Sequence, residues 1–252
     1  MVRYALVTGG AGGLGRALAA HFLERGIHVV LADRDEEMLV LVRSRLGDPD
    51  GLECQVLDVS DGLAWAKLAR RWQSNGRTLD ILVNNACIAS AREPLLEIAP
   101  EHWRSMLDVA LTGAFLGIHA FVPAMVARGH GYVLNIASMA ALGPSPRHGD
   151  YAAAKAGLVS LCETLRDELK GTGVQVSVAC PGAIGHAVGH AWKEGEACAA
   201  VGRMDPFDGM RHVIDSALAG QFFIMTHGDL GESVATRAQA IAEAFRHASG
   251  WQ

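Results

Sequence analysis

Short apolar runs alternate with longer segments of helical spacing along most of this chain. The runs are continuously apolar, which is typical of strands that are buried on both faces of a sheet. Crossovers through the intervening helices make such strands parallel and place helices on both faces. The expected strands are 4–7, 29–32, 54–57, 81–83, 132–136 and 174–179, and the expected helices are 14–24, 36–46, 62–73, 101–128 and 151–169.

The end of the chain continues this pattern more weakly. We expect a helix at 208–218, a strand at the sheet edge at 221–226 and a closing helix at 233–247. The sequence therefore predicts an α/β fold, in which residues 1–252 form a single doubly wound domain around a parallel sheet of about seven strands. Residues 183–207 have weak periodicity, and because irregular segments of this length often form binding loops, we expect the substrate loop there.

Composition narrows the class of function. The formal net charge is −5, and Lys and Arg are scattered rather than clustered, which argues against a nucleic-acid partner. We identify no apolar run near the ~20 residues that span a bilayer, and the N-terminus lacks the features of a signal peptide. We therefore expect no membrane partner and a cytoplasmic protein.

Neither a disulfide framework nor a metal site is expected. The cysteines are odd in number and contain no CxxC pair, which fits ordinary thiols in a reducing compartment. They are Cys54, Cys87, Cys162, Cys180 and Cys198. His186 and His190 could share a helix face, but neighbouring glycines weaken any helix there and no third ligand is evident.

The first expected strand leads into the glycine-rich run Thr8-Gly9-Gly10-Ala11-Gly12-Gly13-Leu14-Gly15, and a helix pattern follows at once. Gly9 can make a tight turn, Gly13 can let the backbone approach a pyrophosphate, and Gly15 can let the helix pack closely on the sheet. The start of that helix, around Leu14, offers free N–H groups and a positive dipole end to phosphates. Strand, loop and helix in this order predict a Rossmann-type dinucleotide site.

The residues at the end of the second strand bear on the choice of cofactor. A carboxylate at Asp33 can accept both hydroxyls of the adenosine ribose and repels a 2′-phosphate. The next residue, Arg34, is a good ligand for such a phosphate. We expect NAD, and NADP with lower probability. A helix-capping or loop carboxylate is the alternative for Asp33, as it is for Asp35.

Polar residues also follow the next two strands. Asp58 and Val59 follow the third strand, where the carboxylate could accept from the adenine amino group. Asn84-Asn85-Ala86 follows the fourth strand, at the carboxyl edge where ligands bind in such sheets. We expect cofactor contacts from Asp58, Val59, Asn85 and Ala86, with simple loop capping as the alternative.

Tyr151 and Lys155 lie four residues apart at the start of a strong helix pattern, so their side chains share a face. A phenol is a poor acid or base near neutrality, but a nearby cation favours the phenolate. Such a group can protonate an alkoxide as hydride arrives, or remove an alcohol proton as hydride leaves. Ser138, near the end of the fifth strand, could bond the substrate oxygen and hold it near Tyr151.

Taken together, these motifs resemble the short-chain dehydrogenase/reductase family from about residue 3 to residue 182. The matching positions are Thr8-Gly9, Gly13, Gly15, Asp58-Val59, Asn84-Asn85-Ala86, Ser138, Tyr151, Lys155 and Pro181-Gly182. The resemblance implies that Tyr151 is the acid/base, that Lys155 tunes it and binds the nicotinamide ribose, and that Ser138 orients the substrate. It also implies that Pro181, Gly182 and the following stretch, including Ile184, close over the nicotinamide.

The chain departs from the family at several positions. Ala110 stands where the family carries an Asn that anchors a water passing protons to the lysine, and alanine cannot do this. Cys87 replaces a Gly and puts a side chain near the cofactor. His186 takes the place of a Thr that bonds the nicotinamide carboxamide. The tail, with Phe222-Phe223 and a final helix, is similar to a sub-branch that often acts on secondary alcohols of aromatic or hydrophobic compounds.

Three functions are compatible with these residues. The leading one is NAD(P)-dependent interconversion of a secondary alcohol and a ketone, on a small-molecule substrate that is hydrophobic or aromatic. Ala110 and Cys87 motivate an alternative, a cofactor-binding sensor or scaffold with little catalysis. Reduction of an imine or an activated C=C bond would use the same hydride geometry. The resemblance further implies a homodimer or homotetramer formed through the helices at 101–128 and 151–169.

Overall fold

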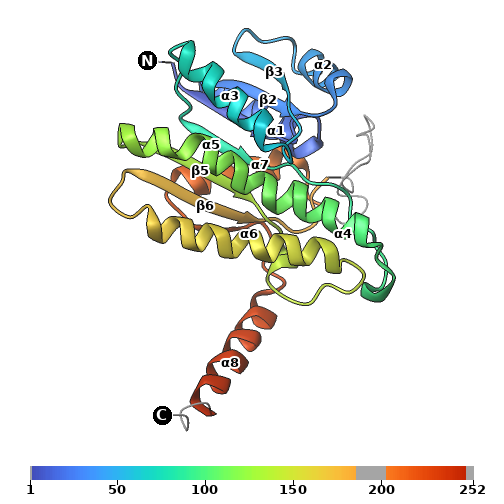
Figure 1. The fold of residues 1–252 in the computed structure, drawn as a ribbon. Coiled ribbons are helices and arrows are strands. Elements are labelled where there is room, and N and C mark those ends of the chain that lie inside the picture. Colours follow the sequence, from blue (N-terminus) through green and yellow to red (C-terminus); the bar gives the residue numbers. More distant parts are fainter. Residues whose placement is uncertain (1, 186–202, 248–252) are drawn as a thin grey trace.

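The computed structural model describes residues 2–185 and 203–247, and its centre is one sheet (Figure 1). The strand order is β3-β2-β1-β4-β5-β6-β7, and every neighbouring pair is parallel. The expected α/β fold with about seven parallel strands is confirmed. The strands are β1 (Tyr4–Thr8), β2 (His28–Asp33), β3 (Leu52–Val56), β4 (Ile81–Asn84), β5 (Gly131–Ile136), β6 (Val174–Cys180) and β7 (Phe223–Met225).

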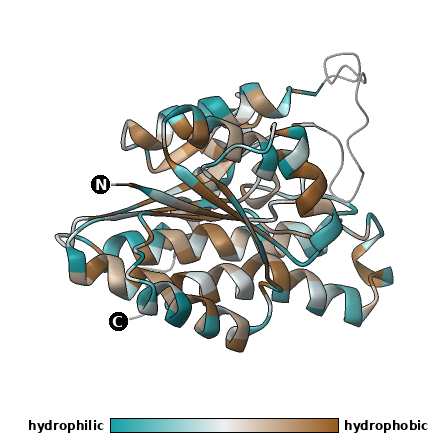
Figure 2. Cartoon of the chain, turned by 90° about the horizontal axis from the view of Figure 1, so that it is seen from above, coloured by the Kyte–Doolittle hydropathy of each residue, from teal (hydrophilic) through white to brown (hydrophobic). Residues whose placement is uncertain are grey.

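Helices cover both faces of the sheet, as Figure 2 shows from above. One face is covered by α1 (Gly13–Glu24), α2 (Glu36–Arg45) and α7 (Pro206–Leu218). The other is covered by α3 (Gly62–Ser74), α5 (Gly113–Arg128) and α6 (Gly149–Glu168). Each of these strands ends, and the helix that follows it begins, at the same edge of the sheet. The loops at that edge can therefore meet around one ligand.

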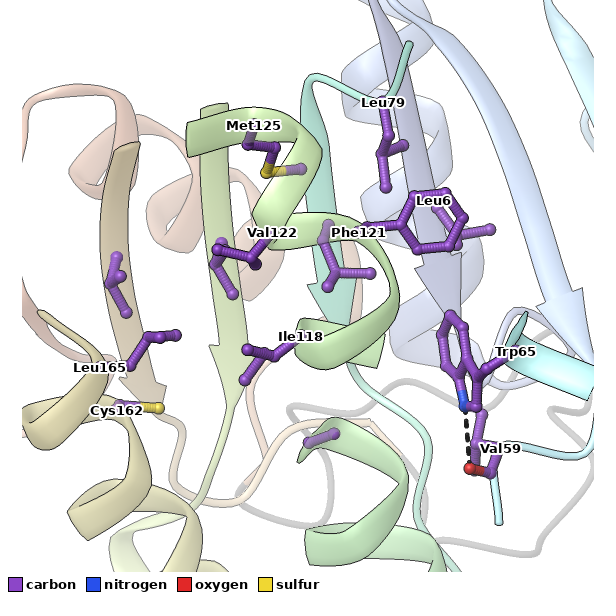
Figure 3. Close-up of a cluster of buried hydrophobic side chains, with 14 of the residues drawn as sticks. Leu6, Val59, Trp65, Leu79, Ile118, Phe121, Val122, Met125, Cys162 and Leu165 are labelled. Atoms are coloured by element: carbon purple, nitrogen blue, oxygen red, sulfur yellow. Dashed lines mark hydrogen bonds between the residues drawn. The ribbon is translucent and has the colours of Figure 1, made fainter. Parts of the chain in front are cut away.

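Two apolar cores hold these layers together, one on each face of the sheet. In the core under α3 and α5, Trp65 and Trp72 pack edge-on against Phe121. The indole N–H of Trp65 donates to the Val59 carbonyl at 2.9 Å, so this buried polar group is satisfied (Figure 3). The bond also fixes the loop that follows β3.

The sheet edges differ from the expectation in detail. β3 begins two residues earlier than predicted and is half exposed, with Cys54 at the surface. As an outer strand it has a neighbour on one side only, so a strand buried on both faces was the wrong expectation there. At the other edge, β7 is shorter than the predicted 221–226.

The predicted helix at 101–128 is a continuous helical stretch with a change of winding inside it. It consists of α4 (Pro100–Leu107), the π-helical turn η2 (Asp108–Thr112) and α5. Residues 100–128 are long and apolar enough to cross a membrane by length and composition, contrary to our reading of the sequence. In this fold, α5 buries Ile118, Phe121, Val122 and Met125 against the sheet.

The last helix, α8 (Gly231–His247), does not close the structure as predicted. It extends away from the sheet and its layers (Figure 1), and between 231 and 246 only Val234 is partly buried. Its link to the rest of the chain includes a hydrogen bond from Arg237 to the Leu142 carbonyl at 3.1 Å. Amphipathic spacing correctly predicted a helix but not where its apolar side lies.

Candidate active site

The strand order reverses between β1 and β4, and in open α/β sheets ligands bind at such a switch point, outside the carboxyl ends of the strands. The glycine-rich loop between β1 and α1 lies at this point. Gly9 has a φ of +65°, a conformation that favours glycine. At Gly15 a Cβ atom would lie 2.3 Å from the Gly9 carbonyl oxygen, so the close packing predicted for this residue is present.

This loop also fits a dinucleotide phosphate. A Cβ atom at Gly13 would meet nothing within 4 Å, so the backbone is open on that side. Gly12 caps α1 without a side-chain bond, and the first turn of the helix holds no acidic residue. Its N–H groups therefore remain available to an anion, and Leu14 lies in that same turn.

The carboxylates predicted at the adenosine end are both engaged in local hydrogen bonds. Asp33 accepts from the Ala11 N–H at 3.0 Å, which ties the end of β2 to the glycine-rich loop. Asp58 is exposed and accepts from the N–H and the hydroxyl of Ser60. These bonds, with the charge of nearby Arg34, hold the pKa of Asp58 below its usual value. Asp35 caps α2 by accepting from Met38 N–H at 3.0 Å, as its alternative role predicted.

The residues after β4 brace the loop rather than project from it. Asn85 donates its amide to the carbonyls of Thr8 and Gly9, at 2.8 and 3.2 Å. The hydroxyl of Thr8 accepts from the N–H groups of Asn85 and Ala86. On the other side, the Val59 side chain is buried beneath α5. The structure therefore brings all the predicted cofactor positions of β1, β3 and β4 to one edge of the sheet.

Tyr151 and Lys155 lie on the first turns of α6, as predicted. The Lys155 ammonium lies 5.7 Å from the centre of the Tyr151 ring and donates to the Ile136 carbonyl at 2.7 Å. Its side chain is 2% exposed, yet no carboxylate among the described residues pairs with it. A buried cation without an anionic partner is costly, which makes this lysine a functional candidate.

Ser138 follows β5 and caps the short helix η3 (Met139–Ala141), which packs against α6. Its hydroxyl accepts from the Ala140 N–H at 3.1 Å and can still donate. Behind Lys155, burial raises the pKa of the Cys180 thiol to about 11, so this thiol stays neutral. The three predicted catalytic residues thus gather at the ends of β5 and β6.

Ala110 lies where the resemblance places the missing relay residue. It is buried in η2 and packs with Met106 and with Ala154 of α6, beside Tyr151. A small void bounded by Thr8, Asn84 and Ala110 is too narrow to admit a water molecule. Cys87 joins the same apolar cluster, with its sulfur 3.9 Å from that of Met106.

The ends of β6 and β7 lie at the same carboxyl edge of the sheet as the residues described above. Pro181 is buried, and Ile184 is buried against α7, where it pairs with Met204. Gly182 donates its N–H to the Thr226 hydroxyl at 3.0 Å, and that hydroxyl lies 2.7 Å from the His227 ring. A Cβ atom at Gly182 would lie 2.5 Å from the imidazole, so the glycine makes room for the ring.

Sequence reasoning did not identify Thr226 and His227 as site residues. Their place directly after the last strand was the available signal, because ligands bind at the carboxyl ends of such strands. His186, His190 and most of the predicted substrate loop lie outside the described residues. Within the described part of the chain, no cluster of His, Cys, Asp or Glu could hold a metal ion.

A cavity of about 170 Å³ lies beside η3, the short helix that Ser138 caps. Apolar residues dominate its walls, and the first turn of α8 contributes to it. The lining residues are Met139, Ala140, Leu142, Gly143, Pro144, Ser145, Leu230, Ser233 and Val234.

Comparison with known proteins agrees with this arrangement. The short chain dehydrogenase family matches residues 3–197. NADP-dependent 3-hydroxy acid dehydrogenase from Escherichia coli K12 is 34% identical over 180 residues, which cover 71% of this chain and 72% of that protein. A 2-dehydro-3-deoxy-L-rhamnonate dehydrogenase (NAD(+)) from Sphingomonas sp. SKA58 is 34% identical over 71% of each chain.

Solved structures extend the likeness beyond the aligned sequences. A short-chain dehydrogenase/reductase from Burkholderia phymatum, in complex with NAD, has a TM-score of 0.85 and 26% identity, covering 96% of this chain and 95% of that one. A serine dehydrogenase in complex with NADP+ has a TM-score of 0.79 and 28% identity, covering 88% and 94%. This chain belongs to the short-chain dehydrogenase family and is an oxidoreductase that acts on hydroxyl or carbonyl groups with a nicotinamide nucleotide.

Proposed function

We propose that this enzyme interconverts a secondary alcohol and a ketone by hydride transfer, with Tyr151 as the acid/base. The observation that supports this most strongly is the buried Lys155 ammonium, which lacks a carboxylate partner among the described residues and lies beside the Tyr151 ring. A positive charge beside the ring stabilises the negative charge that develops on the phenol oxygen during proton transfer. Tyr151 can then take the alcohol proton in oxidation and return it in reduction.

The other residues have supporting roles in this proposal. The Ser138 hydroxyl would donate to the substrate oxygen and hold it near Tyr151. Lys155 keeps one N–H on the Ile136 carbonyl, and its remaining donors would bind the ribose next to the nicotinamide. The bound nucleotide supplies or accepts the hydride. The open backbone at Gly13 and the start of α1 would bind its pyrophosphate.

We propose NAD as the preferred cofactor. The support is the Asp33 carboxylate, which is held at the end of β2 by the Ala11 N–H and would face the adenosine ribose. A 2′-phosphate placed there would meet this negative charge. The relatives differ in their cofactor, since one is described as NADP-dependent and another as using NAD(+).

We propose a hydrophobic or aromatic alcohol as the substrate. The largely apolar cavity beside η3 supports this class, as do Leu95 and Leu96, which are exposed on the short helix η1 (Leu95–Glu97). Hydroxy acids are the competing class, because the relatives named above act on 3-hydroxy acids and on a deoxy-rhamnonate. A panel of 1-phenylethanol, cyclohexanol, 3-hydroxybutanoate and L-serine separates the two.

The test of the chemistry is Tyr151→Phe, compared with Tyr4→Phe at the opposite edge of the sheet. We expect Tyr151→Phe to lower kcat by at least about 100-fold, because it removes the proton transfer, while NADH binding followed by fluorescence stays unchanged. Tyr4→Phe should leave kcat unaltered. If Tyr151→Phe retains most of the rate, or if the enzyme reduces only imines or C=C bonds, the proposal is wrong. The same titration with NADPH should show weaker binding than with NADH.

We also propose a homodimer or homotetramer. Exposed apolar side chains on two helices support it, namely Phe115 on α5 and Ile241 on α8. Light scattering after gel filtration measures the mass directly, and a mass of about 27 kDa, that of one chain, would contradict this proposal.

A further inference from the structure

Asp150 precedes Tyr151 and is the most deeply buried acidic residue of the described chain, with a relative exposure of 0%. Its carboxylate accepts three hydrogen bonds from other elements. The donors are the Ser90 hydroxyl at 2.8 Å, the Ala91 N–H at 3.0 Å and the His102 ring nitrogen Nε2 at 3.0 Å. A carboxylate buried in this way is retained only where its lone pairs are satisfied.

These bonds keep Asp150 charged. Burial by itself would raise the pKa of Asp150, but the hydrogen bonds from Ala91, Ser90 and Tyr151 and the charge of His102 outweigh it. The pKa therefore lies below its usual value, and the group is a carboxylate near neutral pH. Its place in the first turn of α6 adds a favourable interaction with the helix dipole.

The set of Ser90, His102 and Asp150 is not a nucleophilic triad. In such a triad the serine bonds to the histidine, which removes its proton. Here serine and histidine both bond to the carboxylate, so Ser90 has no base beside it. The arrangement ties three elements together, namely the segment after β4, helix α4 and the start of α6.

A second contact fixes the same segment to the same helix. A Cβ atom at Gly149 would lie 2.7 Å from a methyl carbon of Leu95, so η1 packs directly on the first residue of α6. Between these two anchors, Arg92 has a φ of +58°, which is strained for a residue with a side chain. Residues 90–95 are thus tied at both ends to the start of α6, the helix that carries Tyr151.

We propose that Asp150 is a positioning residue for the substrate: its carboxylate fixes residues 90–97 as a rigid wall of the substrate site in front of Tyr151. This inference rests on the proposed function, because it assumes that the substrate reacts at Tyr151. Asp150 itself does not touch the reacting atoms, since consecutive helix residues point about 100° apart. Its effect should therefore fall on substrate affinity rather than on proton transfer.

The test is Asp150→Asn, with Asp167→Asn as the matched control on the exposed side of α6. The amide keeps the shape but removes the charge and has one acceptor oxygen in place of two, so the Ser90, Ala91 and His102 donors can no longer all bond to it. The substrate is 1-phenylethanol or 3-hydroxybutanoate, whichever is oxidised faster. We expect its KM to rise about tenfold, which is the usual effect of an unsatisfied buried group. NADH affinity should stay within about twofold and kcat within about threefold. Asp167→Asn should change none of these.

Hydrogen exchange gives a second readout that needs no substrate. The Ala91 amide bonds to Asp150, so Asp150→Asn should speed exchange in peptides spanning 88–97 and leave α3 peptides unchanged. If Asp150→Asn does not fold, Ser90→Ala is the second variant, because it removes one hydrogen bond and leaves the charge of Asp150 in place. It should raise KM about threefold, since the loss of one hydrogen bond costs less than the loss of the whole set.

The outcomes separate the two proposals. An unchanged KM and unchanged exchange in Asp150→Asn, with Tyr151→Phe inactive, would overturn the positioning role alone. A parallel loss of kcat, NADH affinity and melting temperature in both Asp150→Asn and Ser90→Ala would also overturn it, because that pattern means general destabilisation. An active Tyr151→Phe would instead contradict the proposed function.

Discussion

Two glycines in the first turn of α1 lie two residues apart in opposite surroundings. At Gly15 a Cβ atom would clash with the Gly9 carbonyl, whereas at Gly13 it would point into open space. Gly15→Ala should therefore lower the melting temperature by several degrees, since about 1–3 kcal/mol of overpacking corresponds to roughly 2–12 °C here. Gly13→Ala should leave the melting temperature nearly unchanged and weaken NADH binding.

Calorimetry and NADH fluorescence titration, made on the same samples, check this pair. Gly143→Ala serves as a control, because a Cβ atom there also meets nothing within 4 Å and the position lies outside the phosphate loop. Equal losses of NADH affinity at positions 13 and 143 would show that Gly13 does not face the phosphates.

At the scale of single residues, local patterns predicted that Tyr151 and Lys155 lie together but did not predict their surroundings. Tyr151 and Lys155 are four apart on one helix, and that spacing alone places them together. His102 and Asp150 are 48 residues apart, and Gly182 and Thr226 are 44 apart. No periodicity connects such residues, because their contact depends on how the whole sheet is assembled.

At the scale of elements, the π-helical turn η2 packs Ala110 against α6, the helix that carries Tyr151 and Lys155. Ala110→Asn should raise kcat by about three- to tenfold, a modest share of a general acid–base effect, if proton supply to Lys155 limits the rate. Ala110→Val, which adds bulk without an amide, should not raise kcat.

Steady-state kinetics in both directions measure this effect. A protein that only binds the cofactor would show no gain from either variant. If Ala110→Asn binds NADH normally and its kcat stays unchanged, proton supply does not limit the rate.

Element type was predictable from sequence, whereas winding and placement were not. The runs that form β1, β4 and β5 are mostly apolar and short, so they could be assigned with little ambiguity. The π turn was missed because the apolar spacing of residues 108–112 is compatible with an ordinary α-helix. The position of α8 was missed because amphipathic spacing does not say which surface covers a helix.

At the scale of the whole molecule, we expect the part of the chain from β1 to β7 to supply nearly all of the free energy of unfolding. Deletion of residues 231–252 removes side chains that are almost all exposed where the structure describes them. Because exposed contacts contribute about 1 kcal/mol or less, we expect the melting temperature to fall by less than about 4 °C. Deletion from residue 222 also removes Ile224, which is fully buried, and should unfold the protein.

Scanning calorimetry on dilute samples distinguishes the two deletions. A large loss on removing residues 231–252 alone would mean that α8 is covered by another surface. A second copy of the chain would then be the first candidate, and the mass of the shortened protein would show whether the assembly is lost.

Because every strand of the sheet is parallel, the framework and the variable parts of this molecule are spatially separate. The segments 88–97, 139–148 and 183–207 all leave from the carboxyl edge, and the amino edge carries none of the proposed chemistry. An engineer could graft these three segments from a relative with different preferences and leave the hydride-transfer apparatus in place. Asp150 and Gly149 would then be the attachment points that any grafted first segment must match.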